Sequence, residues 1–199
     1  MIKFDAEATP IATTETPKLT VESIDNHIYF YSGVDSDRCL SLIKQIKQID
    51  TNLRNERLSR DIPDSFEHTP IWLHIQSFGG DLLSAFSVAD QIKRTKTPIY
   101  SIIEGVCASA GTIISCSCNK RYITPSSFML VHQLVGFNWG RYEELKDNMN
   151  LLEMCMKQIT TFYKNNSKMP VNKIISLLKR DSWFDAKQSL ALGLVDEIM

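Results

Sequence analysis

Ser109 is a candidate nucleophile because it stands among small residues, in the segment 105–111, Gly-Val-Cys-Ala-Ser-Ala-Gly. A serine nucleophile must be approached closely by a carbonyl carbon, and small neighbours leave room for that approach. An apolar run precedes the segment and a small-residue run follows it, which predicts a strand-to-helix junction where N–H groups and the helix dipole stabilise an anion. Close helix packing produces the same pattern, so this motif alone leaves both interpretations open.

A second turn, residues 77–81, reads Ser-Phe-Gly-Gly-Asp and also follows an apolar run. Glycines lack side chains, so their backbone N–H groups can point at a substrate oxygen, as an oxyanion hole requires. A simple tight turn has the same signature, and for this motif alone the simple turn is the favoured interpretation.

A serine hydroxyl becomes a good nucleophile only when a base within hydrogen-bond reach removes its proton. Of the four histidines, His27 and His68 flank turns or loops, and His74 lies within a strand where a structural hydrogen bond is expected. His132 ends the apolar run that follows the serine segment, which makes it the best-placed base. Many carboxylates could orient it, and spacing does not choose among them.

The elements that must position these residues alternate between apolar runs and helical patterns. Short apolar runs predict strands at 28–31, 71–75, 99–103, 121–124 and 128–131, the third ended by a turn at Gly105. Three- and four-residue spacing predicts helices at 40–49, 82–92 (inner face Leu82, Leu83, Phe86, Ala89, Ile92), 109–118 and 141–163. The polar stretch 52–68 is interpreted as a loop or a helix extension. This alternation predicts an α/β fold with parallel strands and crossover helices.

The last predicted helix carries apolar residues on more than one side. A stripe from Tyr142 to Tyr163 accounts for packing on its own domain, and four further apolar residues lie off that stripe: Leu151, Met154, Cys155 and Phe162. A monomer does not readily cover such a surface, so the pattern favours self-association, with a fully buried core helix as the alternative.

Composition narrows the class of protein. The 199 residues carry a net charge of −1 with no basic cluster, which argues against nucleic acid as the main partner. No apolar run approaches the ~20 residues that span a bilayer, and no secretion signal is evident, so no membrane partner and a cytoplasmic location are expected. The five cysteines are interpreted as reduced, buried thiols, and no metal or cofactor is expected.

Taken in order, the motifs resemble those of the proteolytic subunit of the Clp protease, the ClpP family of serine peptidases. The resemblance spans residues 28–199 and is carried by these segments: Ser77–Gly80, Ala108–Gly111, Arg121–Ser127, Leu130–Gln133, Arg180–Asp181 and Gly193–Asp196. It implies Ser109 as nucleophile, His132 as base and Asp181 as the carboxylate that orients the histidine. It also implies that the backbone N–H groups of Gly80 and Ala110 form the oxyanion hole. The implied substrate-binding residues are Phe78, Gly79 and Leu134.

The same resemblance implies a repeated ββα fold, shared with crotonases, in which a protruding handle helix interlocks two stacked rings. The expected organisation is an N-terminal arm at 1–20 and one peptidase domain at 21–199, with the handle at about 133–165. A homo-oligomer of two seven-membered rings, a tetradecamer, would hydrolyse unfolded polypeptides through an acyl-enzyme. An unfoldase of the AAA+ class would feed it.

The sequence departs from the family pattern at several positions. Phe78 replaces a proline in the glycine turn, and Lys179 replaces the acidic or polar residue that pairs across rings. These departures motivate a second hypothesis, a non-standard or regulatory subunit of mixed rings with another ClpP-type subunit. A crotonase acting on acyl-CoA thioesters is a third, although that chemistry does not need Ser109 with His132.

Overall fold

The computed structural model describes residues 21–63, 66, 68–136 and 139–199, so the predicted N-terminal arm at 1–20 lies outside the described residues. A sheet forms its centre, with the strand order β1-β2-β3-β4-β5-β8; β6 pairs with β4, and β7 pairs with β6. The strands are β1 (Glu22–Ile24), β2 (His27–Phe30), β3 (Ile71–Ser77), β4 (Ile99–Ala108), β5 (Lys120–Ile123), β6 (Phe128–Val131), β7 (Ser182–Phe184) and β8 (Glu197–Ile198).

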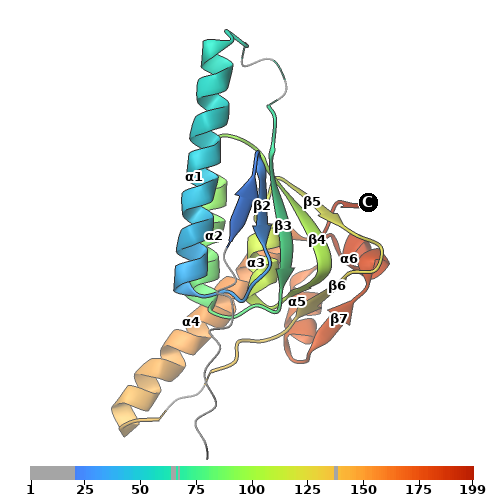
Figure 1. Ribbon diagram of the computed structural model, residues 1–199. Helices are drawn as coiled ribbons and strands as arrows, with labels where there is room; N and C mark the ends of the chain where they lie inside the picture. The colour runs from blue at the N-terminus through green and yellow to red at the C-terminus, as the bar shows by residue number, and fades with distance from the viewer. Residues whose placement is uncertain (1–20, 64–65, 67, 137–138) are drawn as a thin grey trace, which may run out of the picture.

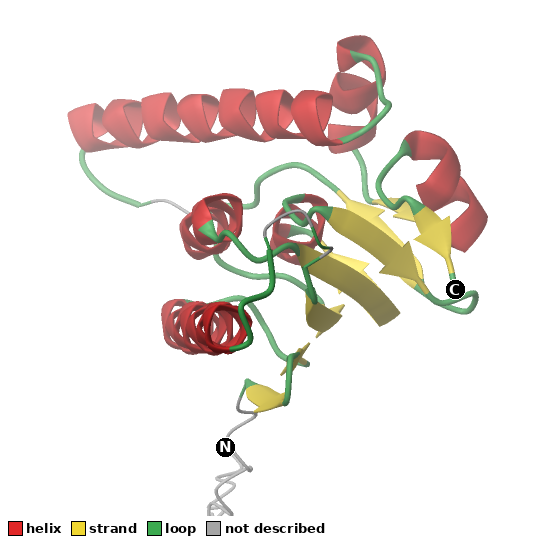
Figure 2. Cartoon of the chain, turned by 90° about the horizontal axis from the view of Figure 1, so that it is seen from above, coloured by secondary structure: helices red, strands yellow, loops and turns green. Residues whose placement is uncertain are grey.

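Most neighbouring strands in this sheet are parallel; β1 beside β2 and β7 beside β6 are the antiparallel pairs of the described chain. The helices are α1 (Ser36–Ser59), α2 (Leu82–Arg94), α3 (Ala110–Cys116), α4 (Tyr142–Asn166), α5 (Val171–Leu178) and α6 (Ala186–Leu192). Helices α1, α2 and α3 connect β2 to β3, β3 to β4 and β4 to β5, and they lie together on one side of the sheet (Figures 1 and 2). The predicted α/β fold with parallel strands and crossover helices is confirmed.

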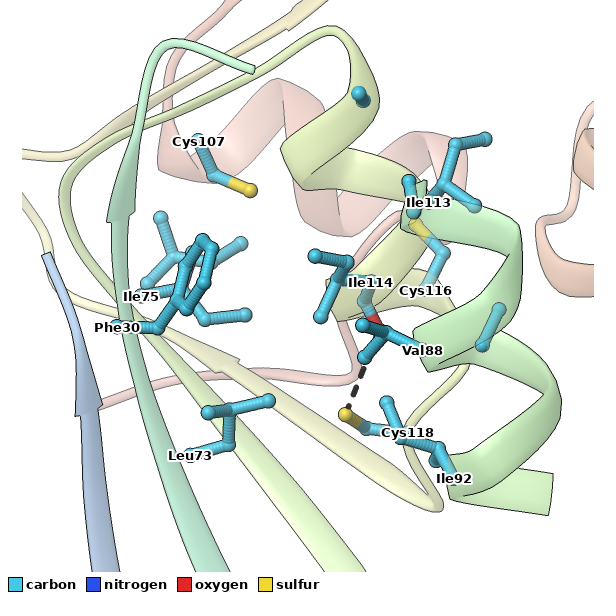
Figure 3. Packing of buried hydrophobic residues seen from close by; sticks show 14 of the residues in the cluster. Phe30, Leu73, Ile75, Val88, Ile92, Cys107, Ile113, Ile114, Cys116 and Cys118 are labelled. Carbon is cyan, nitrogen blue, oxygen red and sulfur yellow. Dashed lines mark hydrogen bonds between the residues drawn. The ribbon is translucent and has the colours of Figure 1, made fainter. Parts of the chain in front are cut away.

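The core fills the space between these helices and the sheet (Figure 3). Phe30, Leu73 and Ile75 project from the strands against Val88 of α2 and Ile114 of α3. All five cysteines are free and buried, as the sequence predicted. Within the described residues, none of the helices combines the length and apolar character needed to cross a membrane.

Burial makes four of these thiols poor nucleophiles. It raises the pKa of Cys39 and of Cys116 to about 11 and that of Cys118 to about 12, and it raises the pKa of Cys107 well above its usual value. A pKa of about 11 leaves roughly one thiolate in a thousand at pH 8, so we expect iodoacetamide to label these residues at least ~100-fold more slowly in the folded protein than in guanidinium. Mass spectrometry of timed digests measures this. Rapid labelling of any of the four in the folded protein would contradict the packing described here.

The strand before Ser109 is longer than predicted. The predicted turn at Gly105 is wrong, because β4 continues through Gly105 to Ala108. Gly105 takes a φ of 77°, and its N–H donates to Ser127 Oγ at 2.6 Å. The glycine therefore introduces an irregularity within the strand and does not end it.

The helix predictions need three smaller corrections. The polar stretch 52–68 begins as a helix extension, because α1 continues through residues 52–59 and ends at Ser59. Leu83 was predicted on the inner face of α2 but is 60% exposed. Helix α3 begins at Ala110 and ends at Cys116, inside the predicted range.

Helix α4 packs on the domain only through its C-terminal half. Ile159 and Tyr163 are buried, whereas Tyr142 and Met149 from the same predicted stripe are exposed. Figure 2 shows the rest of the helix extending past the sheet, and this part also exposes the off-stripe Met154. The single packing stripe is therefore wrong for the N-terminal half, which presents an uncovered apolar surface, as expected of a helix used in self-association.

Candidate active site

Ser109 lies in the tight turn between β4 and α3. Its φ of 54° and ψ of −124° form a backbone conformation that side chains with a Cβ rarely adopt. The Ser109 N–H donates to the Leu130 carbonyl at 2.9 Å, which ties the turn to strand β6. A strained strand-to-helix turn of this kind projects a serine hydroxyl away from the surrounding backbone.

The register of two strand pairs determines where His132 and Asp181 lie. Parallel pairing of β4 with β6 sets Ala108 opposite Leu130. His132 follows the last residue of β6 and therefore lies near the serine turn, which follows Ala108. Antiparallel pairing of β6 with β7 sets Val131 opposite Ser182, which places Asp181 beside His132. The distance from His132 Nδ1 to Asp181 Oδ1 is 3.7 Å.

The two side chains of this pair differ in their exposure to solvent. The His132 side chain is 17% exposed, whereas that of Asp181 is 76% exposed. At 3.7 Å the contact is an ion-pair distance and longer than a hydrogen bond. Among the described contacts no hydrogen bond joins Ser109 to His132, an arrangement common in serine hydrolases before substrate binds.

A small cleft of about 90 Å³ brings the predicted residues together. Its wall includes Gly80, Ser109, Ala110, His132 and Leu134. Four helical residues that also contribute apolar surface to its wall were not assigned to a site from the sequence: Leu82, Ile113, Ile159 and Tyr163. They stem from three helices, and helical spacing marks such residues as core without indicating which of them face a cleft.

The glycine turn packs directly on the serine turn. A Cβ built on Gly79 would lie 2.7 Å from Ala108 O and 3.0 Å from Ala110 N, and the φ of Gly79 is 89°. A Cβ on Gly80 would lie 2.1 Å from Val34 O, with a φ of 147°. Only glycine fits at either position without displacing backbone.

Two residues that line the cleft have backbone N–H groups without an acceptor among the described residues. Within the part of the chain that the structure describes, neither the Gly80 N–H nor the Ala110 N–H donates to a protein acceptor. Both residues line the cleft that also contains Ser109. A pair of unpaired N–H groups beside a serine can bind a carbonyl oxygen that gains negative charge.

The three predicted substrate-binding residues differ in position. Leu134 lines the cleft, whereas Phe78 is 76% exposed and is not among the described residues of its wall. Gly79 packs against the backbone of the serine turn. Phe78 is therefore available only to a ligand that extends beyond the cleft.

His74 has the structural role expected from its strand position. Its Nε2 lies 2.9 Å from His27 Nδ1, and its Nδ1 lies 3.1 Å from Glu104 Oε1. Burial, followed by the charge of His74, lowers the pKa of His27. Both histidines lie on the sheet, and neither is among the residues that line the cleft.

Comparisons with known proteins agree on one family. A family model described as Clp protease matches residues 23–199. The chain is 29% identical over 175 residues to the ATP-dependent Clp protease proteolytic subunit of Streptococcus mutans, covering 85% of this chain and 88% of the relative. It is 32% identical over 131 residues to proteolytic subunit 2 of Treponema denticola, covering 65% of this chain and 66% of the relative.

A solved structure of a ClpP1 point mutant from Listeria monocytogenes shares the fold. The TM-score is 0.74 at 20% sequence identity, and the match covers 88% of this chain and 91% of the other. The predicted ClpP-type fold is thereby confirmed.

Proposed function

This chain belongs to the Clp protease family, and we propose that it is a serine peptidase in which Ser109, His132 and Asp181 act as one catalytic unit. The observation that carries the proposal is the strand register, which gathers three residues from distant parts of the sequence. Ser109 and His132 share one cleft, and His132 Nδ1 lies 3.7 Å from Asp181 Oδ1.

The chemistry follows from these positions. Ser109 Oγ attacks the carbonyl carbon of a peptide bond while His132 accepts its proton, since the other ring nitrogen of His132 faces Asp181. The N–H groups of Gly80 and Ala110 bind the oxyanion. His132 then returns the proton to the leaving amine, and water hydrolyses the acyl-enzyme by the same steps in reverse roles.

The substrate we propose is an unfolded polypeptide in an extended conformation. The cleft is narrow, and Leu134, Ile113 and Ile159 contribute apolar surface to it. To be cleaved, a peptide bond must enter a cleft of about 90 Å³ with the substrate backbone continuing on both sides. An unfolded chain can enter in this way, whereas a folded protein cannot. Gly79 and Phe78 lie on the turn along which such a chain would extend.

For the assembly, we propose one peptidase domain at 21–199 with α4 as the handle. Clp protease subunits form oligomeric rings that work with Clp ATPases, and the exposed apolar residues of α4 suit a contact between copies. Lys179 favours a second candidate, a subunit that joins mixed rings with a standard partner. Native mass measurement with and without that partner separates the two, and a stable, active homo-oligomer counts against mixed rings.

The proposed function is tested by incubating the purified protein with unfolded casein and with a fluorogenic peptide. Turnover that disappears on loss of the Ser109 hydroxyl supports the proposal. Complete absence of turnover in assembled wild-type protein, with and without a Clp ATPase, would reject it.

The role proposed for Asp181 gives a separate prediction. Asp181→Asn keeps the shape of the side chain but removes the charge that stabilises a protonated His132, so we expect kcat to fall by about 10²- to 10⁴-fold with little change in KM. Peptide hydrolysis at several substrate concentrations measures this. The matched control is Asp90→Asn, an exposed position on α2, which should retain full activity. Equal kcat for both variants would remove Asp181 from the catalytic unit.

A further inference from the structure

A pair of buried hydroxyls connects helix α4 to the backbone of the nucleophile. Tyr163 on α4 and Thr112 on α3 lie 51 positions apart in sequence, and their hydroxyl oxygens are 2.6 Å apart. Thr112 Oγ1 is also 2.6 Å from the Ser109 carbonyl oxygen. Tyr163 and Thr112 are 2% and 0% exposed, so solvent does not compete for these hydrogen bonds.

The hydrogen bonds have a defined direction. The Ser109 carbonyl can only accept, so the Thr112 hydroxyl donates to it. The Thr112 oxygen then has only acceptor capacity left for Tyr163, whose hydroxyl must be the donor. Burial raises the pKa of Tyr163 far above its usual range, so the phenol keeps its proton at any working pH.

The carbonyl at the end of this relay belongs to the peptide group whose N–H is that of Ala110. Because C=O and N–H of one peptide are conjugated, a donor on the oxygen makes the N–H more positive and a better donor itself. The Thr112 N–H also donates to the same carbonyl at 3.0 Å. The Ser109 carbonyl thus accepts two hydrogen bonds, while the Ala110 N–H is left unpaired within the described chain and lines the cleft.

We propose that Tyr163 is a positioning residue for the oxyanion hole: acting through Thr112, it polarises the Ser109–Ala110 peptide and fixes the direction of the Ala110 N–H. This inference rests on the proposed peptidase function. It also gives α4 a direct connection to the chemistry, because Tyr163 belongs to the half of that helix that packs on the domain. Tyr163 lines the cleft, and its hydroxyl is connected to the Ser109–Ala110 peptide only through Thr112.

The first test is Tyr163→Phe, which removes one oxygen and keeps the ring. We expect kcat for a fluorogenic peptide to fall about three- to tenfold with KM unchanged, since the lost interaction strengthens in the transition state. Affinity for a peptide boronate, whose adduct places an oxygen in the oxyanion hole, should fall by the same factor. Affinity for the unreactive peptide amide of the same sequence should not change. Tyr100→Phe, on strand β4 and not among the described residues that line the cleft, is the matched control and should leave all four quantities unchanged.

The second test separates catalysis from packing. Thr112→Val alone removes the donor to Ser109 O and leaves the Tyr163 hydroxyl buried and unpaired, so both kcat and Tm should fall. The double variant Thr112→Val with Tyr163→Phe removes both hydroxyls together, which should recover most of the Tm while kcat stays at least tenfold below wild type. Thr112→Ser keeps the relay hydroxyl and should retain wild-type kcat.

The outcomes separate this inference from the proposed function. If the wild type cleaves peptides and Tyr163→Phe changes Tm or KM but leaves kcat and boronate affinity unchanged, the relay is structural and the inference is wrong. If kcat of the double variant recovers together with its Tm, the inference is also wrong. Absence of cleavage by the wild type would instead reject the proposed function, and boronate binding would then be absent in every variant.

Discussion

Replacing Ser109 with alanine is expected to reduce peptide and casein hydrolysis to the background rate, a loss of at least roughly 10³-fold. The variant removes one oxygen atom and keeps Cβ, so the backbone strain of the turn is the same before and after. The Ser109 N–H to Leu130 O hydrogen bond does not involve the side chain and remains. Initial rates with a fluorogenic peptide, normalised to protein mass, measure the loss.

Two companion variants make the result specific. Ser126→Ala alters an exposed serine in the turn before β6 and should keep wild-type activity. Ser109→Gly should be as inactive as Ser109→Ala yet more stable by about 1 kcal/mol, because glycine adopts a φ of 54° without strain. Residual activity above one tenth of wild type in Ser109→Ala would show that another residue is the nucleophile.

Gly79→Ala is the second change for which we expect a large effect. The added Cβ would stand 2.7 Å from Ala108 O and from Ser109 Cβ, and the φ of 89° is unfavourable for alanine. Backbone atoms cannot rotate away as a flexible side chain can, so the serine turn must move. We expect the free energy of unfolding to fall by about 2–4 kcal/mol and kcat by at least ~100-fold. Chemical denaturation and peptide hydrolysis measure the two effects.

The control for this variant is Gly33→Ala. Gly33 lies beside the same turn, but its added Cβ would meet its nearest neighbour, Gly79 O, at an ordinary 3.6 Å. It should change stability by less than about 1 kcal/mol and leave kcat within twofold. If Gly79→Ala behaves like Gly33→Ala, the close contact between the two turns is not a requirement of the site.

Local pattern predicted the central architecture well. Apolar runs such as 71–75 and 128–131 are strands, and the helices between them cross over one face of the sheet. The strength of this prediction has a physical cause: a strand buried on both faces reads as a continuous apolar run, and parallel strands require crossover helices. The family resemblance supplied the pairing of His132 with Asp181, which no local pattern contained.

The sequence was less informative about features that depend on tertiary contacts, such as the end of β4 and the packing of α4. Gly105 resembles a strand terminator, yet pairing with β3 and β6 carries β4 past it. The apolar residues of α4 have one periodicity along the whole helix, but only the C-terminal half finds a surface to pack on. Periodicity identifies an apolar face and cannot say whether the chain itself or another molecule covers it.

The Tyr163–Thr112 contact shows a further limit. Each residue alone fits an ordinary position, an aromatic on a helical stripe and a hydroxyl in a small-residue helix. Their meeting depends on how α4 packs across α3, and hydrogen bonds between side chains 51 positions apart have no signature in spacing. Such contacts become visible only in three dimensions.

The strained turn at Ser109 also affects the stability of the folded chain. Its backbone conformation is one that glycine adopts freely and serine does not, so folding alone would favour losing the hydroxyl. The serine side chain is therefore present in this turn at a cost in folding free energy that the fold itself does not require.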